Sequence, residues 1–170
     1  MVTSRIRVPR PGRAARLIAT AAAVAALTVS TVGAATADDH RKVLDSPLTG
    51  LPQAMVGQTL FGVVAGGLPW RLEGGRAKLW ADGRLVVDVD GLVLAAGGAA
   101  GTNPIPNGQA IVTCAGAVAA MSSVVPFSVP DGDAHISETV SLPSGCLAPA
   151  VFFAGVPAPG VARWFAVTGF

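Results

Sequence analysis

A hairpin in the middle of the chain decides the class of fold, and it reads RAKLWADGRLVVDV over residues 76–89. Apolar and polar side chains alternate on both sides of a central turn, which is typical of strands that are buried on one face only. A two-residue loop would place Lys78 on the apolar face, whereas a three-residue loop with a left-handed Gly83 keeps this lysine off that face. We therefore predict the three-residue loop, with Leu79 directly opposite Leu85.

This register sorts the other side chains of the hairpin onto two faces. On the outer face, Arg76 lies opposite Asp88 and Trp80 lies opposite Arg84. Such exposed pairs are each worth well under about 1 kcal/mol, so they orient the hairpin more than they stabilise it. The inner face then holds five apolar side chains: Ala77, Leu79, Leu85, Val87 and Val89.

The rest of the chain repeats short apolar runs that are separated by turns. Its 170 residues include 21 glycines and 13 prolines, which favours many turns over long helices. No window carries a capped helical pattern of useful length, although the alanine-rich stretch 114–121 could form a single helical turn. We expect an all-β fold, an antiparallel β-sandwich or small closed barrel of about eight strands. The candidate strands span residues 58–65, 76–81, 84–94, 109–115, 124–129, 134–142, 150–156 and 162–170.

The N-terminal residues have the pattern of a secretory signal peptide. Five arginines precede an apolar run over residues 17–32, and an Ala-Thr-Ala sequence at residues 35–37 offers the small side chains that a signal peptidase requires. The alternative is an uncleaved membrane anchor. Alanine and threonine, however, favour insertion into a bilayer only weakly, and charged residues directly follow the apolar run. We expect residues 1–37 to be removed, leaving a secreted protein that begins at Asp38 and has no membrane span.

Removal of this segment changes the net charge of the protein. The chain from residue 38 onward keeps seven of the 12 basic residues and all ten acidic ones, so its formal net charge is −3. A domain of this charge without a basic run repels phosphate, so we do not expect a nucleic-acid partner. Residues 38–54 are polar, contain two prolines and lack periodicity, and we interpret them as a loose polar arm. Residues 55–170 then form a single β domain.

The two cysteines, Cys114 and Cys146, both lie in this domain. An even pair in an exported protein favours a disulfide, and only one pairing is possible. A catalytic thiol would require a histidine partner and a zinc site would require further ligands at close spacing, and the sequence shows neither. We predict a structural disulfide, which restricts the unfolded chain by about 3–4 kcal/mol in the loop-entropy model.

Few residues offer acid–base or metal chemistry. Of the two histidines, His40 lies in the presumed arm, so His135 is the candidate base within the domain. Glu138 falls on the apolar side of its strand, where it is either a functional carboxylate or a group that reaches water at a bulge or sheet edge. Asp131 and Asp133 carry oxygens of the kind that calcium takes, but the further spaced ligands of a calcium loop are missing. His135 and Glu138 are thus the polar candidates, and we expect no metal or cofactor.

The tryptophans and one long loop are the remaining candidates for binding. One interpretation of the three tryptophans is a platform on which sugars stack: Trp70, Trp80 and Trp164. In a small β-sandwich, however, indole side chains more often lie in the core or cover a hairpin. The loop over residues 95–108 is long and rich in glycine, as binding loops often are. We expect a non-catalytic exported domain that binds an extracellular protein, a surface polymer or a small ligand. The alternative is a small extracellular hydrolase or an enzyme inhibitor that acts through this loop.

Several stretches of the chain carry a resemblance to known proteins. Residues 75–92, which read GRAKLWADGRLVVDVDGL, and the closing segments 147–153 and 164–170 resemble a group of uncharacterised secreted bacterial proteins over nearly all of the mature domain. This resemblance implies a family without an assigned activity. Residues 85–92 are also similar to the strand pattern of chordin-type (CHRD) domains, which implies an extracellular β-sandwich, although the histidine-containing signature of that family is missing here.

Overall fold

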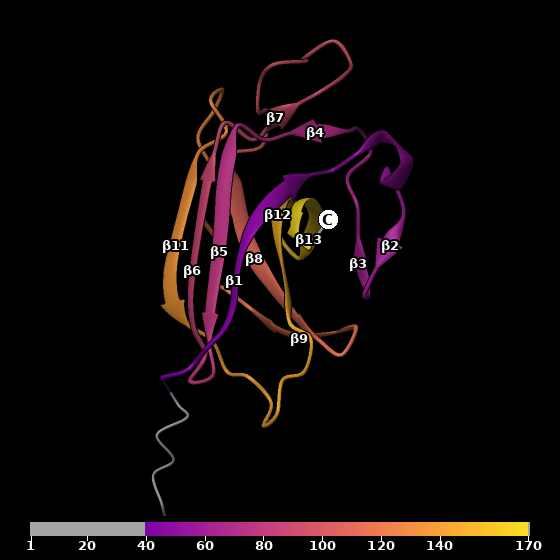
Figure 1. Ribbon diagram of the computed structural model, residues 1–170. Helices are drawn as coiled ribbons and strands as arrows, with labels where there is room; N and C mark the ends of the chain where they lie inside the picture. The colour runs from indigo at the N-terminus through magenta and orange to yellow at the C-terminus, as the bar shows by residue number, and fades with distance from the viewer. Residues whose placement is uncertain (1–39, 170) are drawn as a thin grey trace, which may run out of the picture. The chain divides into compact units, whose positions relative to one another are not determined.

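The structure is a computed structural model that describes residues 40–169, so the predicted signal peptide at residues 1–37 lies outside the described range. The expected all-β, antiparallel fold is confirmed, and its main sheet curls strongly into a half-barrel (Figure 1). Among the residues described, no helix is long and apolar enough to cross a bilayer.

Nine strands build the half-barrel, and two short two-stranded sheets are added to it. The main sheet contains β1 (Lys42–Gly50), β5 (Gly74–Trp80), β6 (Arg84–Asp90), β8 (Asn107–Cys114), β9 (Ala117–Met121), β10 (Val125–Pro126), β11 (Ala134–Thr139), β12 (Ala150–Ala158) and β13 (Val161–Thr168). Eight of these follow the order β10-β8-β12-β13-β1-β5-β6-β11, and β9 also pairs with β8. The short pairs are β2 (Thr59–Leu60) with β3 (Val63–Val64) and β4 (Trp70–Arg71) with β7 (Val93–Leu94), and a 3-10 turn, η1 (Gln53–Met55), precedes β2.

The β5–β6 hairpin has the register that its sequence predicts. Leu79 pairs with Leu85, and Gly83 has a φ of 87°. A Cβ added at Gly83 would lie 2.0 Å from the carbonyl oxygen of Val140, so glycine is required here for space as well as for its left-handed backbone. The three-residue loop is therefore confirmed.

The expectation of a loose polar arm over residues 38–54 is wrong for most of its length. Lys42–Gly50 form β1, which lies inside the sheet between β13 and β5. This strand pairs with β5 up to Pro47 and with β13 from Leu48 onward, so it joins the two halves of the curled sheet. The sequence pattern hides β1 because Pro47 lacks an amide hydrogen and an irregularity at Val43 breaks the alternation of side chains.

Two neighbouring strands inside the sheet, β12 and β13, are buried on both faces over most of their length. Phe152 and Trp164 share one face, where the Phe61 ring meets Phe152 edge to face at a centroid distance of 6.4 Å. Phe153 and Phe165 belong to a second aromatic group on the inner side of the half-barrel. Burial on both faces explains why these strands read as continuous apolar runs in the sequence.

Residues 58–65, which we expected to be one strand, instead form the β2–β3 hairpin. The chain reverses at Phe61 and Gly62, whose φ angles are 50° and 82°. Ala65 then forms a β-bridge with Trp164, so the hairpin covers β13 (Figure 1). The alanine-rich stretch 114–121 holds no helical turn: the chain turns at Ala115 and Gly116 and continues as β9. Two-residue strands are too short to show an alternating pattern.

Cys114 and Cys146 form the predicted disulfide, with a Cα–Cα distance of 5.1 Å. Cys114 is the last residue of β8, and Cys146 lies in the segment that leads from β11 to β12. The bridge therefore ties the end of an inner strand to a connection that has little regular structure of its own.

Candidate functional site

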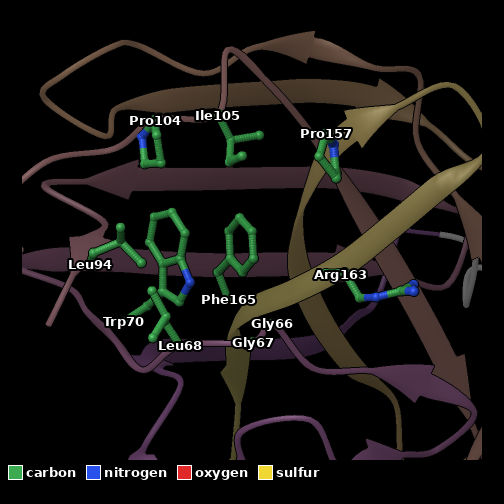
Figure 2. Close-up of a pocket in the computed structure, with 10 residues that line it drawn as sticks. All are labelled: Gly66, Gly67, Leu68, Trp70, Leu94, Pro104, Ile105, Pro157, Arg163 and Phe165. Atoms are coloured by element: carbon green, nitrogen blue, oxygen red, sulfur yellow. The ribbon is translucent and has the colours of Figure 1, made fainter. Parts of the chain in front are cut away.

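An apolar pocket of about 340 Å³ lies between β4, the loop after β7 and the strands β12 and β13 (Figure 2). The rings of Trp70 and Phe165 lie side by side at its centre, with Pro104 and Ile105 next to them. Arg163 is the one charged residue among those that line it. The other apolar side chains that line the pocket are Leu68, Leu94 and Pro157.

The centre of the pocket is a pair of stacked rings. The centroids of Trp70 and Phe165 are 3.9 Å apart and their planes differ by 13°. Both side chains are almost fully buried, with 5% and 4% of their surface exposed. Two glycines make room for the pair: a Cβ at Gly155 would lie 2.0 Å from the Phe165 ring, and a Cβ at Gly66 would lie 2.9 Å from it. The pocket is therefore built by core packing and does not depend on surface loops alone.

The glycine-rich loop over residues 95–108 supplies one wall of this pocket through Pro104 and Ile105. The loop is held down by Asn103, which is fully buried. The Asn103 side-chain amide donates hydrogen bonds to the carbonyl oxygens of Ile105 and Ser128, and its oxygen accepts one from the Ile105 amide, each at 2.8 Å. The sequence indicates Asn103 only as one residue of the 95–108 loop, whereas in the structure this buried asparagine fixes the wall through three hydrogen bonds.

Arg163 lies at the end of the pocket that is shared with Pro157 (Figure 2). Its guanidinium extends away from the ring pair, and Nη1 donates a hydrogen bond to the carbonyl oxygen of the neighbouring Ala162 at 3.0 Å. In the part of the chain that the structure describes, no carboxylate forms an ion pair with Arg163. The pocket therefore runs from apolar side chains to a single positive charge at its rim.

The two polar candidates, His135 and Glu138, do not line this pocket. His135 lies on the outer face of β11, where its Nδ1 is 2.7 Å from Oδ1 of the exposed Asp88. Glu138 lies on the same strand, which is an edge of the sheet, and accepts two hydrogen bonds from Ser123. The edge position that we gave as one explanation for Glu138 is thus present, and the structure does not bring the two candidates together.

Asp131 and Asp133 lie in the turn before β11. Asp133 forms hydrogen bonds that hold this turn in the fold. Oδ1 of Asp133 accepts a hydrogen bond from the Gly91 amide at 2.9 Å, and the Asp133 amide donates one to the Ser128 hydroxyl at 2.7 Å. Across residues 40–169, no group of three or more histidine, cysteine, aspartate or glutamate side chains is placed to hold a metal ion.

The three tryptophans lie in three different parts of the fold and do not form a common platform. Trp164 is fully buried, and its Nε1 has no hydrogen-bond partner among the described groups. Trp80 covers the β5–β6 turn, with the Arg84 guanidinium 3.9 Å and the Lys42 ammonium 5.5 Å from its ring centre. Only Trp70 lines the apolar pocket.

Charged side chains on the outer face of β1 and β5 form a small network around Asp45. Its two carboxylate oxygens accept hydrogen bonds from Lys42 and Arg76. These hydrogen bonds, that of Lys42 first, hold the pKa of the Asp45 carboxyl below its usual value of 3.8. The network lies on the exposed side of the sheet and contributes no residue to the pocket.

No protein-family model, curated protein or solved structure matches this chain.

Proposed function

We propose that this protein is a non-catalytic, exported binding domain that holds a small apolar molecule in the pocket at Trp70 and Phe165. The observation that carries the proposal is the stacked ring pair at the centre of a preformed apolar pocket of about 340 Å³. This volume falls within the range of roughly 300–1,000 Å³ that is usual for small-molecule sites. A signal-like N-terminal sequence and a disulfide both support export.

The residues around the pocket favour binding over catalysis. The lining consists of two glycines, two prolines, aliphatic and aromatic side chains, and Arg163, so it offers no nucleophile, carboxylate or imidazole. His135 and Glu138 belong to β11 and do not line the pocket. The pocket is shallow, so a guest would rest on apolar surface and stay partly open to solvent, and its affinity would come from removing that surface from water.

The lining of the pocket favours a small apolar guest. The Trp70–Phe165 pair is almost fully buried and exposes little of its rings, so a guest would also pack against the aliphatic side chains around it. Leu68 is 42% exposed at the entrance, and a bound guest would cover this side chain. The Asn103 hydrogen bonds keep the Pro104–Ile105 wall in place, so little ordering of the loop would oppose binding.

A neutral fluorescent probe, N-phenyl-1-naphthylamine, tests this proposal. We expect the purified protein to bind the probe, and Leu68→Asp to weaken binding by about tenfold or more because a carboxylate would be buried against an apolar guest. Val129→Asp is the matched control, since Val129 is 55% exposed and lies outside the pocket lining. An absence of binding to the unmodified protein, or equal losses in both variants, would overturn the proposal.

A further inference from the structure

One strand of the sheet, β9, has a free edge beside an open groove. In the described chain, β9 pairs only with β8, and its other edge faces a groove of about 500 Å³. Val118 and Ala119 line the groove from β9, and Leu142 and Pro143 line it from the segment that follows β11. The seam between the two edges of the half-barrel is held at Glu138 and is open at this groove.

This edge lacks the charges that commonly protect exposed strands. Natural edge strands are guarded by lysines, prolines, inward charges or bulges, because unpaired backbone groups are a template for a further strand. Residues 91–130, which include all of β8, β9 and β10, contain no aspartate, glutamate, lysine, arginine or histidine. The one guarding device in β9 is an irregularity at Ala119.

Large apolar side chains are exposed around the same edge. Val118 and Met121 of β9 are 46% and 58% exposed. Phe61 is 43% exposed at the tip of the β2–β3 hairpin, and its ring lies 3.5 Å from the position that a Cβ of Gly116 would take. A surface that combines apolar side chains with free backbone groups is suited to pairing with another strand.

We propose that the free edge of β9 pairs with β9 of a second copy of this chain, forming a twofold dimer through a continuous antiparallel sheet. An antiparallel pairing of identical edges is self-complementary, because each free amide of one strand meets a carbonyl of the other. The uncharged stretch around β9 removes the like-charge repulsion that usually opposes such self-pairing. The small side chains of Ala117 and Ala119 suit entry into the groove of the partner copy.

A second copy fits this surface better than a charged partner does. The edge offers no charge to steer or select an acidic or basic protein, so pairing depends on backbone hydrogen bonds and apolar contact alone. In the proposed dimer Val118 and Met121 of the two copies would lie near the same axis. Their exposed surface would then be covered in both chains at once.

The test is the molar mass in solution, measured by sedimentation equilibrium from about 1 to 200 µM. We expect the unmodified protein to reach the mass of two chains, and Val118→Lys with Met121→Lys to weaken association by about tenfold or more. Val129→Lys is the matched control, because Val129 is similarly exposed but belongs neither to β9 nor to the groove lining, and it should dimerise as the unmodified protein does. Circular dichroism and the melting temperature verify that each variant is folded.

Hydrogen exchange gives a second readout that needs no substitution. Amides of β9 that do not bond to β8 should become protected as the protein concentration rises. A monomer at every concentration would overturn the proposal, and so would a dimer that persists unchanged in the double lysine variant or that forms without protection of β9.

Discussion

Glu138 and Ser123 join the two edges of the curled sheet. Oε1 of Glu138 accepts a hydrogen bond from the Ser123 amide at 2.8 Å, and Oε2 accepts one from the Ser123 hydroxyl at 2.6 Å. Glu138 belongs to β11 at one end of the strand order, and Ser123 lies between β9 and β10 at the other. A carboxylate thus makes a contact that backbone hydrogen bonds make in a closed barrel.

Replacement of this carboxylate should destabilise the fold. We expect Glu138→Ala to lower the free energy of unfolding by about 1 kcal/mol or less, because the Ser123 amide and hydroxyl lose a charged acceptor at an exposed contact where water replaces it in part. Glu138→Gln keeps one acceptor oxygen and should cost less. Urea denaturation measures both, with Thr139→Ala as the control for an exposed side chain on the same strand. If Glu138→Ala is as stable as the unmodified protein, the contact does not hold the seam.

The ring pair of the pocket should depend on Gly155. A Cβ at this position would lie 2.0 Å from Cε2 of Phe165, and stacking against Trp70 limits the movement of that ring. We expect Gly155→Ala to destabilise the protein by about 1–3 kcal/mol and to weaken probe binding as well. Gly98→Ala is the control, because no atom lies within 4 Å of its Cβ position. Unchanged stability in Gly155→Ala would mean that the ring pair is free to move.

The sequence predicts the local features of this fold better than its long-range ones. The Leu79–Leu85 register and the left-handed Gly83 follow from a few neighbouring residues, whose alternation and turn chemistry agree. β1 was missed because its partners, β5 and β13, are distant in the chain and because Pro47 breaks its pattern. Pairing between distant segments leaves little trace in local periodicity.

The pocket was beyond sequence reasoning for a similar reason. Its central contact joins Trp70 to Phe165, which are separated by most of the domain, and its wall depends on hydrogen bonds of the buried Asn103. We expected Trp70 either in a platform with the other tryptophans or in the core. Its ring is in fact almost fully buried and still lines the pocket, and composition alone does not predict such a position.

The stability contributed by Asp45 should depend on pH. The pKa of Asp45 is lowered in the folded protein, so its contribution is present above the unfolded pKa, near 3.8, and is lost as the pH falls through the lower folded value. Asp45→Asn should therefore reduce the melting temperature slightly at pH 7, and the difference should vanish at a pH well below 3.8. Asp90→Asn controls for loss of an exposed carboxylate. A difference that is constant with pH would show that the effect does not come from ionised Asp45.

Arg163 should give the pocket a preference for guests with an anionic end. The guanidinium lies at the rim and has no carboxylate partner within the described residues, so a negative group that extends from the pocket would meet it. We expect an aryl or alkyl carboxylate to bind about three- to tenfold more tightly than its neutral amide, and Arg163→Gln to remove this preference. Arg84→Gln is the control on a distant face. A preference that survives in Arg163→Gln would assign the selectivity to another group.

Removal of the disulfide should lower stability without altering the pocket. The Cys114–Cys146 bridge closes a sequence separation of 32 residues, and neither cysteine lines the pocket at Trp70. Because a bridge acts mainly by restricting the unfolded chain, we expect the double substitution Cys114→Ala, Cys146→Ala to cost about 2–5 kcal/mol and to leave probe affinity unchanged at temperatures where the protein is folded. Chemical denaturation and fluorescence titration measure the two quantities on one sample. A large loss of affinity in the folded variant would show that the bridge also positions the binding residues, through the connection that leads into β12.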